Sequence, residues 1–198
     1  MREELLEPLF RRLRLAKVLP VIRRYPRCSY LDVGCGRNAT LLRAVEPHVA
    51  FGVGIDRRAP AIAGDTIFTV RGDVERRLPF ASGTFDVATM LAVLEHLFEP
   101  ARTLAEVRRV LKPGGTLTIT VPSHAAKPVL EFLAFRIGVV SASEIADHKR
   151  YFNKGDLLDI AERAGFALVQ HRYFELGFNN FALLRPSGRS HAEAIANA

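Results

Sequence analysis

Three aspartates that follow short apolar runs are the side chains of this sequence best placed to act together. Asp32, Asp56 and Asp73 each stand at or near the end of a stretch rich in valine, isoleucine, leucine or phenylalanine. In an open parallel sheet a ligand lies beyond the carboxyl ends of the strands, so three such ends can place three carboxylates along one extended molecule. Carboxylates accept hydrogen bonds from hydroxyl, amino and ammonium groups. The spacing therefore predicts a site for an extended ligand that carries such groups.

A glycine turn after the first of these runs could bring the backbone itself to the ligand. Gly34 and Gly36 allow a sharp turn and a close approach, and a helix expected to begin near Ala39 would aim free amides at the same place. This pattern is typical of a nucleotide-type cofactor loop. Because Asp56 follows about 20 residues on, the loop also matches the dinucleotide fingerprint. A nicotinamide-dependent oxidoreductase is therefore an alternative, which the other two aspartates disfavour.

The elements that would position these residues follow from the alternation of β-rich runs with amphipathic helices, which predicts a doubly wound α/β sheet. A helix over residues 100–111 presents Leu104, Val107 and Leu111 on one face and ends at a turn that begins with Lys112. A second helix is expected near 153–164. The expected strands are residues 28–34, 50–55, 66–71, 85–91, 115–121, 166–173 and 178–184.

Motifs beyond the glycine loop resemble the class I S-adenosylmethionine-dependent methyltransferases, in the small-molecule branch known as type 11. The resemblance covers roughly residues 28 to 184. It rests on the acid-terminated strands, on Phe85-Asp86-Val87-Ala88, on Leu94-Glu95-His96-Leu97, on Glu106-Val107-Arg108-Arg109-Val110-Leu111-Lys112-Pro113-Gly114-Gly115, and on His148-Lys149-Arg150-Tyr151-Phe152.

The resemblance implies a Rossmann-like, seven-stranded, mostly parallel sheet with a terminal antiparallel strand pair. It implies S-adenosylmethionine as cofactor and the O- or C-methylation of a small, partly apolar molecule. Asp32 would organise the loop or the cofactor's ammonium group, Asp56 would accept from the ribose hydroxyls, and Asp73 would accept from the adenine amino group. The implied cofactor-binding residues are Asp32, Gly34, Cys35, Gly36, Asp56, Arg57, Asp73, Val74 and Leu91.

Two histidines are the candidates for a general base at the acceptor. His96 lies in the family-like Glu95-His96 pair, and His148 begins a segment that should flank the acceptor pocket. A histidine of near-neutral pKa could deprotonate a hydroxyl, although helix-end packing is the favoured role for His96. Tyr151 and Phe152 are expected to wall the pocket. The histidines show no ligand-like spacing with thiols or carboxylates, so no metal site is expected.

The chain departs from the family pattern at Asn38, where a glycine is usual. Asparagine tolerates the left-handed conformation better than most residues, so the turn can survive. The substitution leaves a non-catalytic or regulatory cofactor-binding protein as an alternative function.

Seven cations and no acid lie within residues 11–27, which equals the whole net charge of +7. With apolar residues at helical spacing, this stretch is expected to form an amphipathic cationic helix, either a solvated face over the cofactor edge or a contact with an anionic membrane surface. Few aromatic residues interleave with the cations, and the Asn/Asp-Pro-Pro-Tyr/Phe signature of amino-methylating nucleic-acid enzymes is absent from the sequence. A nucleic-acid methyltransferase is therefore the weaker alternative.

The expected organisation is a basic helical cap over residues 1–27, a catalytic domain over 28–185 and a flexible tail over 186–198. Within the domain, an apolar insertion over 122–150 is expected to act as a lid. The acidic start lacks a signal core, so a cytoplasmic protein is expected. Cys28 and Cys35 should be reduced thiols, and Cys35 could alternatively be reactive at a helix start. The sequence does not indicate an oligomeric state.

Overall fold

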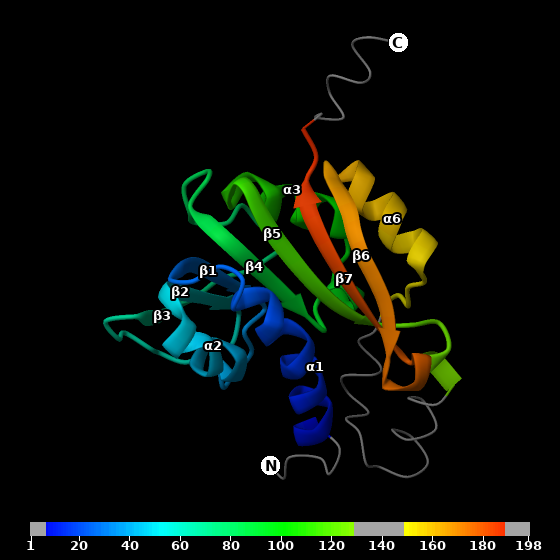
Figure 1. Cartoon of the computed structure of the whole chain (residues 1–198), viewed down its shortest axis with the longest axis horizontal. Helices are drawn as coiled ribbons and strands as arrows, with labels where there is room; N and C mark the ends of the chain where they lie inside the picture. Colours follow the sequence, from blue (N-terminus) through cyan, green and yellow to red (C-terminus); the bar gives the residue numbers. More distant parts are fainter. Residues whose placement is uncertain (1–6, 129–148, 189–198) are drawn as a thin grey trace.

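A computed structural model describes residues 7–128 and 149–188 of the 198-residue chain. Its described part contains one seven-stranded sheet, in the order β3-β2-β1-β4-β5-β7-β6 (Figure 1). The first five strands run parallel, and β7 runs antiparallel to both β5 and β6. This confirms the predicted fold class. The strands are β1 (Cys28–Val33), β2 (Val49–Asp56), β3 (Ile67–Arg71), β4 (Phe85–Leu91), β5 (Leu111–Pro122), β6 (Phe166–Phe174) and β7 (Asn179–Pro186).

Helices cover both faces of this sheet (Figure 1). The apolar side chains of α1 (Glu7–Ile22) and α2 (Thr40–Val45) pack with Tyr30 of β1 in one buried cluster. Those of α3 (Pro100–Val110) and α6 (Lys154–Arg163) pack with Leu31 of β1 in another. Because successive residues of a strand point to opposite faces, Tyr30 and Leu31 divide between the two layers. Short 3-10 turns complete the described elements, η1 (Glu46–His48), η2 (Leu94–His96) and η4 (Glu175–Gly177).

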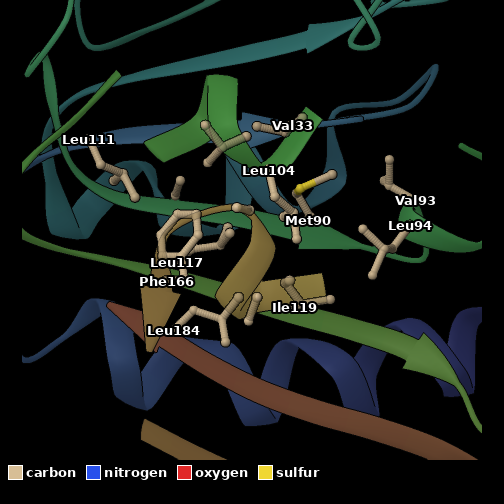
Figure 2. Close-up of a cluster of buried hydrophobic side chains, with 14 of the residues drawn as sticks. Val33, Met90, Val93, Leu94, Leu104, Leu111, Leu117, Ile119, Phe166 and Leu184 are labelled. Carbon is tan, nitrogen blue, oxygen red and sulfur yellow. The ribbon is translucent and has the colours of Figure 1, made fainter. Parts of the chain in front are cut away.

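The larger cluster joins the parallel strands to the antiparallel pair (Figure 2). Met90 of β4, Ile119 of β5 and Leu184 of β7 are at most 1% exposed and lie in the same cluster as Leu104 of α3. Burying one such side chain contributes about 1.5–3 kcal/mol. The cluster therefore holds the strand ends that carry the site in fixed relative positions.

Strand β5 begins earlier than the sequence predicts. The expected strand began at residue 115, but Leu111 already pairs with Phe85 of β4, and the register shifts before Val87 pairs with Thr116. Lys112 to Gly115 therefore form an irregularity within the strand rather than a turn before it. Helix α3 ends at Val110 for the same reason. Strand β4 has the predicted bounds.

Helix α1 packs through its last turn. Val18, Val21 and Ile22 are buried, whereas Arg12 and Lys17 are exposed. The cationic side chains described here therefore lie mostly on the solvent side of a packed helix. In the part of the chain that the structure describes, no helix is long and apolar enough to cross a bilayer. Most of the expected lid, residues 129–148, and most of the expected tail, residues 189–198, lie outside the described residues.

The amino end of β4 is tied to its neighbours by Asp86, which generates a stability prediction. Its Oδ2 accepts from the Ser29 backbone N (2.9 Å) and hydroxyl (2.6 Å) of β1, and from Lys112 Nζ of β5 (2.9 Å). Burial opposes ionisation, but the bonds from Lys112 and Ser29 lower the pKa of Asp86 overall. The carboxylate therefore links three neighbouring strands while it is ionised.

We expect Asp86→Ala to lower the free energy of unfolding by about 1–2 kcal/mol at pH 7, because charge-assisted bonds on a partly exposed group are lost. A lowered folded-state pKa gives stability that is present above the unfolded-state pKa and is lost as pH falls through the folded value, so the difference should shrink in acid. Urea unfolding at pH 7 and pH 3 measures both. Asp159→Ala, which removes a 3.7 Å surface pair with Arg163, is the control and should change stability little. An equal effect of the two variants would contradict the role of Asp86.

Candidate active site

The turn after β1 is bonded to the end of β2. The backbone N atoms of Gly34 and Cys35 donate to the carbonyl oxygen of Ile55 at 2.8 and 3.2 Å. The Gly36 N donates to Oδ2 of Asp56 at 3.1 Å. Gly34 and Gly36 have φ of +78° and +69°, a region that L side chains rarely adopt. The predicted glycines thus occur where the turn needs them, and one of the predicted acids holds the turn.

Close packing fixes two further positions around this turn. A Cβ on Gly34 would overlap Cγ2 of Val93, in the segment after β4. A Cβ on Gly54 of β2 would lie 2.8 Å from Sγ of Cys35. Burial raises the pKa of Cys35 to about 12, with Asp32 and Asp56 adding to the rise. Cys35 is therefore a buried, protonated thiol that fills space over Gly54, which argues against a reactive role.

The third left-handed position of the turn lies one residue later than the sequence predicts. Ala39 has φ 47° and ψ 42°, whereas Asn38, where that conformation was expected, is not among the residues with positive φ. The Ala39 side chain is fully buried beside Leu42 in the cluster under α2. Packing therefore selects the small residue for the strained position. The turn forms as predicted, although Ala39 rather than Asn38 supplies its left-handed residue.

Asp32 lies almost fully buried at the end of a chain of hydroxyl groups. Thr89 of β4 donates from Oγ1 to Oδ1 of Asp32 at 2.9 Å. Since that hydroxyl has a single hydrogen, the Tyr30 hydroxyl, 2.6 Å away, donates to Thr89 in turn. Burial raises the pKa of Asp32 to about 7, the Thr89 bond opposes the rise, and Asp56 adds to it. Neither Tyr30 nor Thr89 was singled out from the sequence, because each resembles an ordinary strand residue.

The other two acids follow the ends of β2 and β3. Asp56, the last residue of β2, also accepts from the Arg58 N through Oδ1 at 2.7 Å. Asp73 pairs with Arg57 Nη2 at 2.8 Å, and this hydrogen bond lowers its pKa. Since β1, β2 and β3 are parallel neighbours, the three predicted acids lie together along the carboxyl ends of these strands, which form one side of the sheet. Arg57 links two of the acid-bearing segments.

The remaining predicted cofactor residues lie near the same edge. Val74 follows Asp73 and packs, half-buried, against the larger core cluster. Leu91 is the last residue of β4 and packs, half-buried, against the cluster under α2. The strands therefore bring every predicted cofactor residue to their carboxyl ends.

A buried acid beside this edge was missed as a functional candidate. Glu95 lies in η2, directly after β4, and is only 1% exposed. Its Oε2 is buried without a hydrogen-bond partner in the described structure. Burial raises the pKa of Glu95 to about 7, against the opposing charges of His96 and Arg14. The sequence does contain an indication of this burial, because Leu94 and Leu97 are apolar and lie close to Glu95. An acid among apolar residues in a short turn is drawn out of solvent with them.

The candidate catalytic histidines are only partly described. His96 lies in η2 and is half-buried, with its backbone N donating to the Val93 carbonyl oxygen at 3.0 Å. His148 lies outside the described residues. The role of either as a base stays a prediction.

Tyr151 and Phe152 lie in the segment that leads into α6. Both line an open pocket of about 550 Å³ between the start of α6 and His124, which follows β5. Phe152 is 1% exposed and belongs to the larger core cluster, so it contributes little surface to the pocket. No residue of the glycine turn lines this pocket. Within residues 7–128 and 149–188, no three His, Cys, Asp or Glu side chains gather as metal ligands would.

Comparison with known proteins identifies the family to which this arrangement is similar. Residues 2–171 match the model of the methyltransferase domain. The chain is 30% identical over 163 residues to the ubiquinone/menaquinone biosynthesis C-methyltransferase UbiE of Cereibacter sphaeroides, which covers 75% of this chain and 64% of that enzyme. The chain thus spans somewhat less than two thirds of that relative.

Solved structures show the same fold at lower identity. A Haloferax volcanii protein solved in complex with the Trm112 methyltransferase activator superposes with a TM-score of 0.70 at 16% identity, over 88% of this chain and 91% of its own. CalO1, a methyltransferase of calicheamicin biosynthesis in its SAH-bound form, superposes with a TM-score of 0.64 at 22% identity. The superposition covers 90% of this chain and 55% of CalO1. These likenesses concern the fold.

The contact between Gly34 and Val93 gives a prediction for the glycine turn. Gly34→Ala should lower the free energy of unfolding by about 2–4 kcal/mol, the sum of left-handed strain and overpacking. Gly83→Ala is a matched control, because Gly83 has φ +66° but nothing within 4 Å of its added Cβ, and it should show the strain alone. Adding Val93→Ala to Gly34→Ala should recover the overpacking part. Equal losses from the two single variants in chemical denaturation would show that the contact is unimportant.

The burial of Glu95 gives a prediction for pH. A folded-state pKa of about 7 against an ordinary 4.5 means that stability declines as pH rises between these values. Glu95→Gln removes the ionisation, so it should raise the free energy of unfolding by about 1–3 kcal/mol at pH 8 and by under ~0.5 kcal/mol at pH 4.5. Thermal unfolding across this range measures the difference. A variant that destabilises the protein equally at both pH values would show that folding does not raise the pKa of Glu95.

Proposed function

This chain belongs to the class I S-adenosylmethionine-dependent methyltransferases, and from this premise we propose that it methylates a carbon or an oxygen of a small, partly apolar molecule. The observation that carries the proposal is the glycine turn held by Asp56, with Asp32 and Asp73 at the ends of the adjoining strands. The kind of acceptor molecule and the kind of partner that the whole protein uses are likewise proposed rather than observed.

The residues present fit S-adenosylmethionine, which supplies an activated methyl group on a sulfonium when bound. The position of a Cβ on Gly36 has nothing within 4 Å, so open space lies over the turn where a ligand can approach the backbone. Asp56 would accept from the ribose hydroxyls with the lone pairs that its two backbone bonds leave free. Asp73 would accept from the adenine amino group, with the Val74 amide beside the ring. Asp32 would face the ammonium end or organise the turn.

Positioning is the main contribution that this chain can make to the reaction. Methyl transfer is an in-line displacement at an activated carbon, and holding two reactants in a near-attack geometry can supply about 7–11 kcal/mol. The turn is rigid, because three backbone N atoms and two steric contacts fix it. Rigid placement of the donor is therefore the chemistry for which these residues are suited.

A small-molecule acceptor is favoured by the relatives and by the charge distribution. The named relative is a C-methyltransferase of ubiquinone and menaquinone biosynthesis, and CalO1 is a methyltransferase of calicheamicin biosynthesis. The cations of residues 11–27 that the structure describes lie mostly on the exposed side of α1 and the turn after it, and they are not interleaved with exposed aromatic side chains that could stack bases. This supports a small molecule over nucleic acid.

Calorimetric titration with S-adenosylmethionine and S-adenosylhomocysteine, beside NAD and NADP, tests the cofactor assignment. We expect saturable binding of the first pair alone. Asp56→Asn should weaken it by about tenfold or more, because charge-assisted bonds to the ribose are lost. Asp65→Asn, at an exposed position of the loop before β3, should bind as the wild type does. Binding of a nicotinamide cofactor without S-adenosylmethionine would overturn the proposal, and binding without turnover of any acceptor would favour the non-catalytic alternative.

A further inference from the structure

Three polar side chains form one continuous chain of hydrogen bonds between β1 and β4. Thr89 donates from Oγ1 to Oδ1 of Asp32 at 2.9 Å and lies 2.6 Å from the Tyr30 hydroxyl. Asp32 and Thr89 are register partners in this parallel pair of strands, and Tyr30, two residues before Asp32, points to the same face of the sheet. Tyr30 and Thr89 are fully buried, and Asp32 is 3% exposed. The chain of hydroxyl groups is therefore closed to solvent except at its Asp32 end.

The direction of the hydrogens in this chain follows from the partners of Tyr30. Burial and the nearby charge of Asp32 raise the pKa of Tyr30 well above its ordinary value, so the phenol keeps its hydrogen. Among the described residues that hydrogen has one acceptor, Oγ1 of Thr89. The reverse direction would leave it unpaired among apolar side chains, which is unfavourable. The hydrogens therefore point from Tyr30 through Thr89 to Asp32, and a donor aimed at a carboxylate favours its ionised form.

Asp32 has one carboxylate oxygen that this chain does not use. Oδ1 accepts from Thr89, and no hydrogen bond from the described residues reaches Oδ2. Oδ2 is not among the fully enclosed atoms that lack a partner, so it retains some contact with the exterior. The glycine turn follows Asp32 directly, and open space lies over Gly36 of that turn. Asp32 therefore has an acceptor left for a ligand that binds at this turn.

The titratable groups around Asp32 favour a cationic ligand. They are Tyr30 of the same strand, Cys35 of the turn and Asp56 of β2. Tyr30 and Cys35 stay neutral, because burial raises the pKa of each. The negative charge of Asp56 raises the pKa of Asp32, because two carboxylates near one turn repel each other. A positive group bound beside them relieves this repulsion.

We propose that Tyr30 and Thr89 are positioning residues of the cofactor site, whose hydroxyl chain keeps Asp32 ionised and oriented so that its Oδ2 binds the cofactor's ammonium group. This rests on the proposed methyltransferase function and deepens it, by assigning the residues that prepare Asp32 and by coupling cofactor binding to a proton. Burial raises the pKa of the unliganded Asp32 to about 7, so its carboxyl group is partly protonated near neutral pH. When the ammonium group binds, that proton leaves for solvent and the carboxylate forms the ion pair.

Calorimetric titration with S-adenosylhomocysteine between pH 5.5 and 7.5 tests the coupling. This ligand keeps the ammonium group of the cofactor, whereas 5′-methylthioadenosine lacks it and is the comparison ligand. For the wild type we expect the affinity for S-adenosylhomocysteine to fall about tenfold or more from pH 7.5 to 5.5, because protons compete with the ammonium group for Asp32. The affinity for 5′-methylthioadenosine should change less than about twofold. Two buffers of different ionisation enthalpy should report a released proton with S-adenosylhomocysteine alone.

Variants of the hydroxyl chain separate its role from that of the carboxylate. Thr89→Val keeps the shape of the side chain and should move the midpoint of the pH profile upward by about one unit, because a hydrogen bond to ionised Asp32 is lost. Thr89→Ser restores the donor and should return the midpoint to the wild-type value. Tyr30→Phe should shift it in the same direction by less, since Thr89 can still donate. Asp32→Asn should bind more weakly, with no dependence on pH in this range.

Thr118→Val is the matched control. Thr118 is the register partner of Thr89 on β5, is fully buried, and its Oγ1 has no hydrogen-bond partner within the described residues. The same atoms change without any effect on the chain to Asp32, so the pH midpoint should be that of the wild type. Carbon-13 NMR of the unliganded protein gives a second reading. The carboxyl resonance that Asp32→Asn removes should titrate near pH 7 in the wild type and at higher pH in Thr89→Val.

The outcomes distinguish this proposal from the one on which it rests. If the wild type binds S-adenosylhomocysteine with the same affinity across the range, the coupling to Asp32 is overturned and the cofactor assignment stands. The role of the hydroxyls is overturned if Thr89→Val and Tyr30→Phe keep the wild-type midpoint, or if Thr118→Val shifts it as far as Thr89→Val does. Tyr30→Phe makes this comparison by itself if Thr89→Val does not fold. If the wild type binds no S-adenosylhomocysteine even at pH 7.5, the proposed function fails and this inference fails with it.

Discussion

The tie between the turn after β1 and the end of β2 is the constraint on which the site depends. It uses three backbone N atoms, the Ile55 carbonyl oxygen and one carboxylate. It can form only because Gly34 leaves room for Val93 and Gly54 leaves room for Cys35. The segments after β1, β2 and β4 are thereby fixed relative to one another, and each contributes a candidate functional residue. A side chain added at either glycine would separate segments that the ligand needs together.

Two buried acids at the carboxyl ends of the strands show how the fold tolerates carboxyl groups whose burial lowers its stability. Asp32 and Glu95 are almost fully buried, and burial raises the pKa of each to about 7. Asp32 has a hydroxyl chain to hold it, whereas Oε2 of Glu95 has no partner in the described structure. The large cluster of apolar residues on the α3 and α6 face offsets such penalties, so the carboxylates can be retained where a ligand would use them.

The antiparallel end of the sheet positions elements that the parallel part alone could not. Strand β7 lies between β5 and β6, and Phe181 and Leu183 of β7 pack with Val21 of α1. The last turn of α1 also packs on the cluster around Tyr30. One helix therefore crosses from the parallel to the antiparallel part of the sheet.

The sequence by itself determined the order and type of the strands, the glycine turn and the three acids at its edge, because these follow from local periodicity and from residues tied to one backbone conformation. It also indicated the final strand pair. Tertiary structure decided that Ala39 rather than Asn38 is left-handed, that Phe152 is mainly a core residue, and that β5 starts at Leu111. It alone revealed that Glu95 is buried, and that the Tyr30 and Thr89 hydroxyls lie behind Asp32. Each of these depends on partners far away in the chain, and burial and hydrogen bonding between distant segments leave little trace in local sequence patterns.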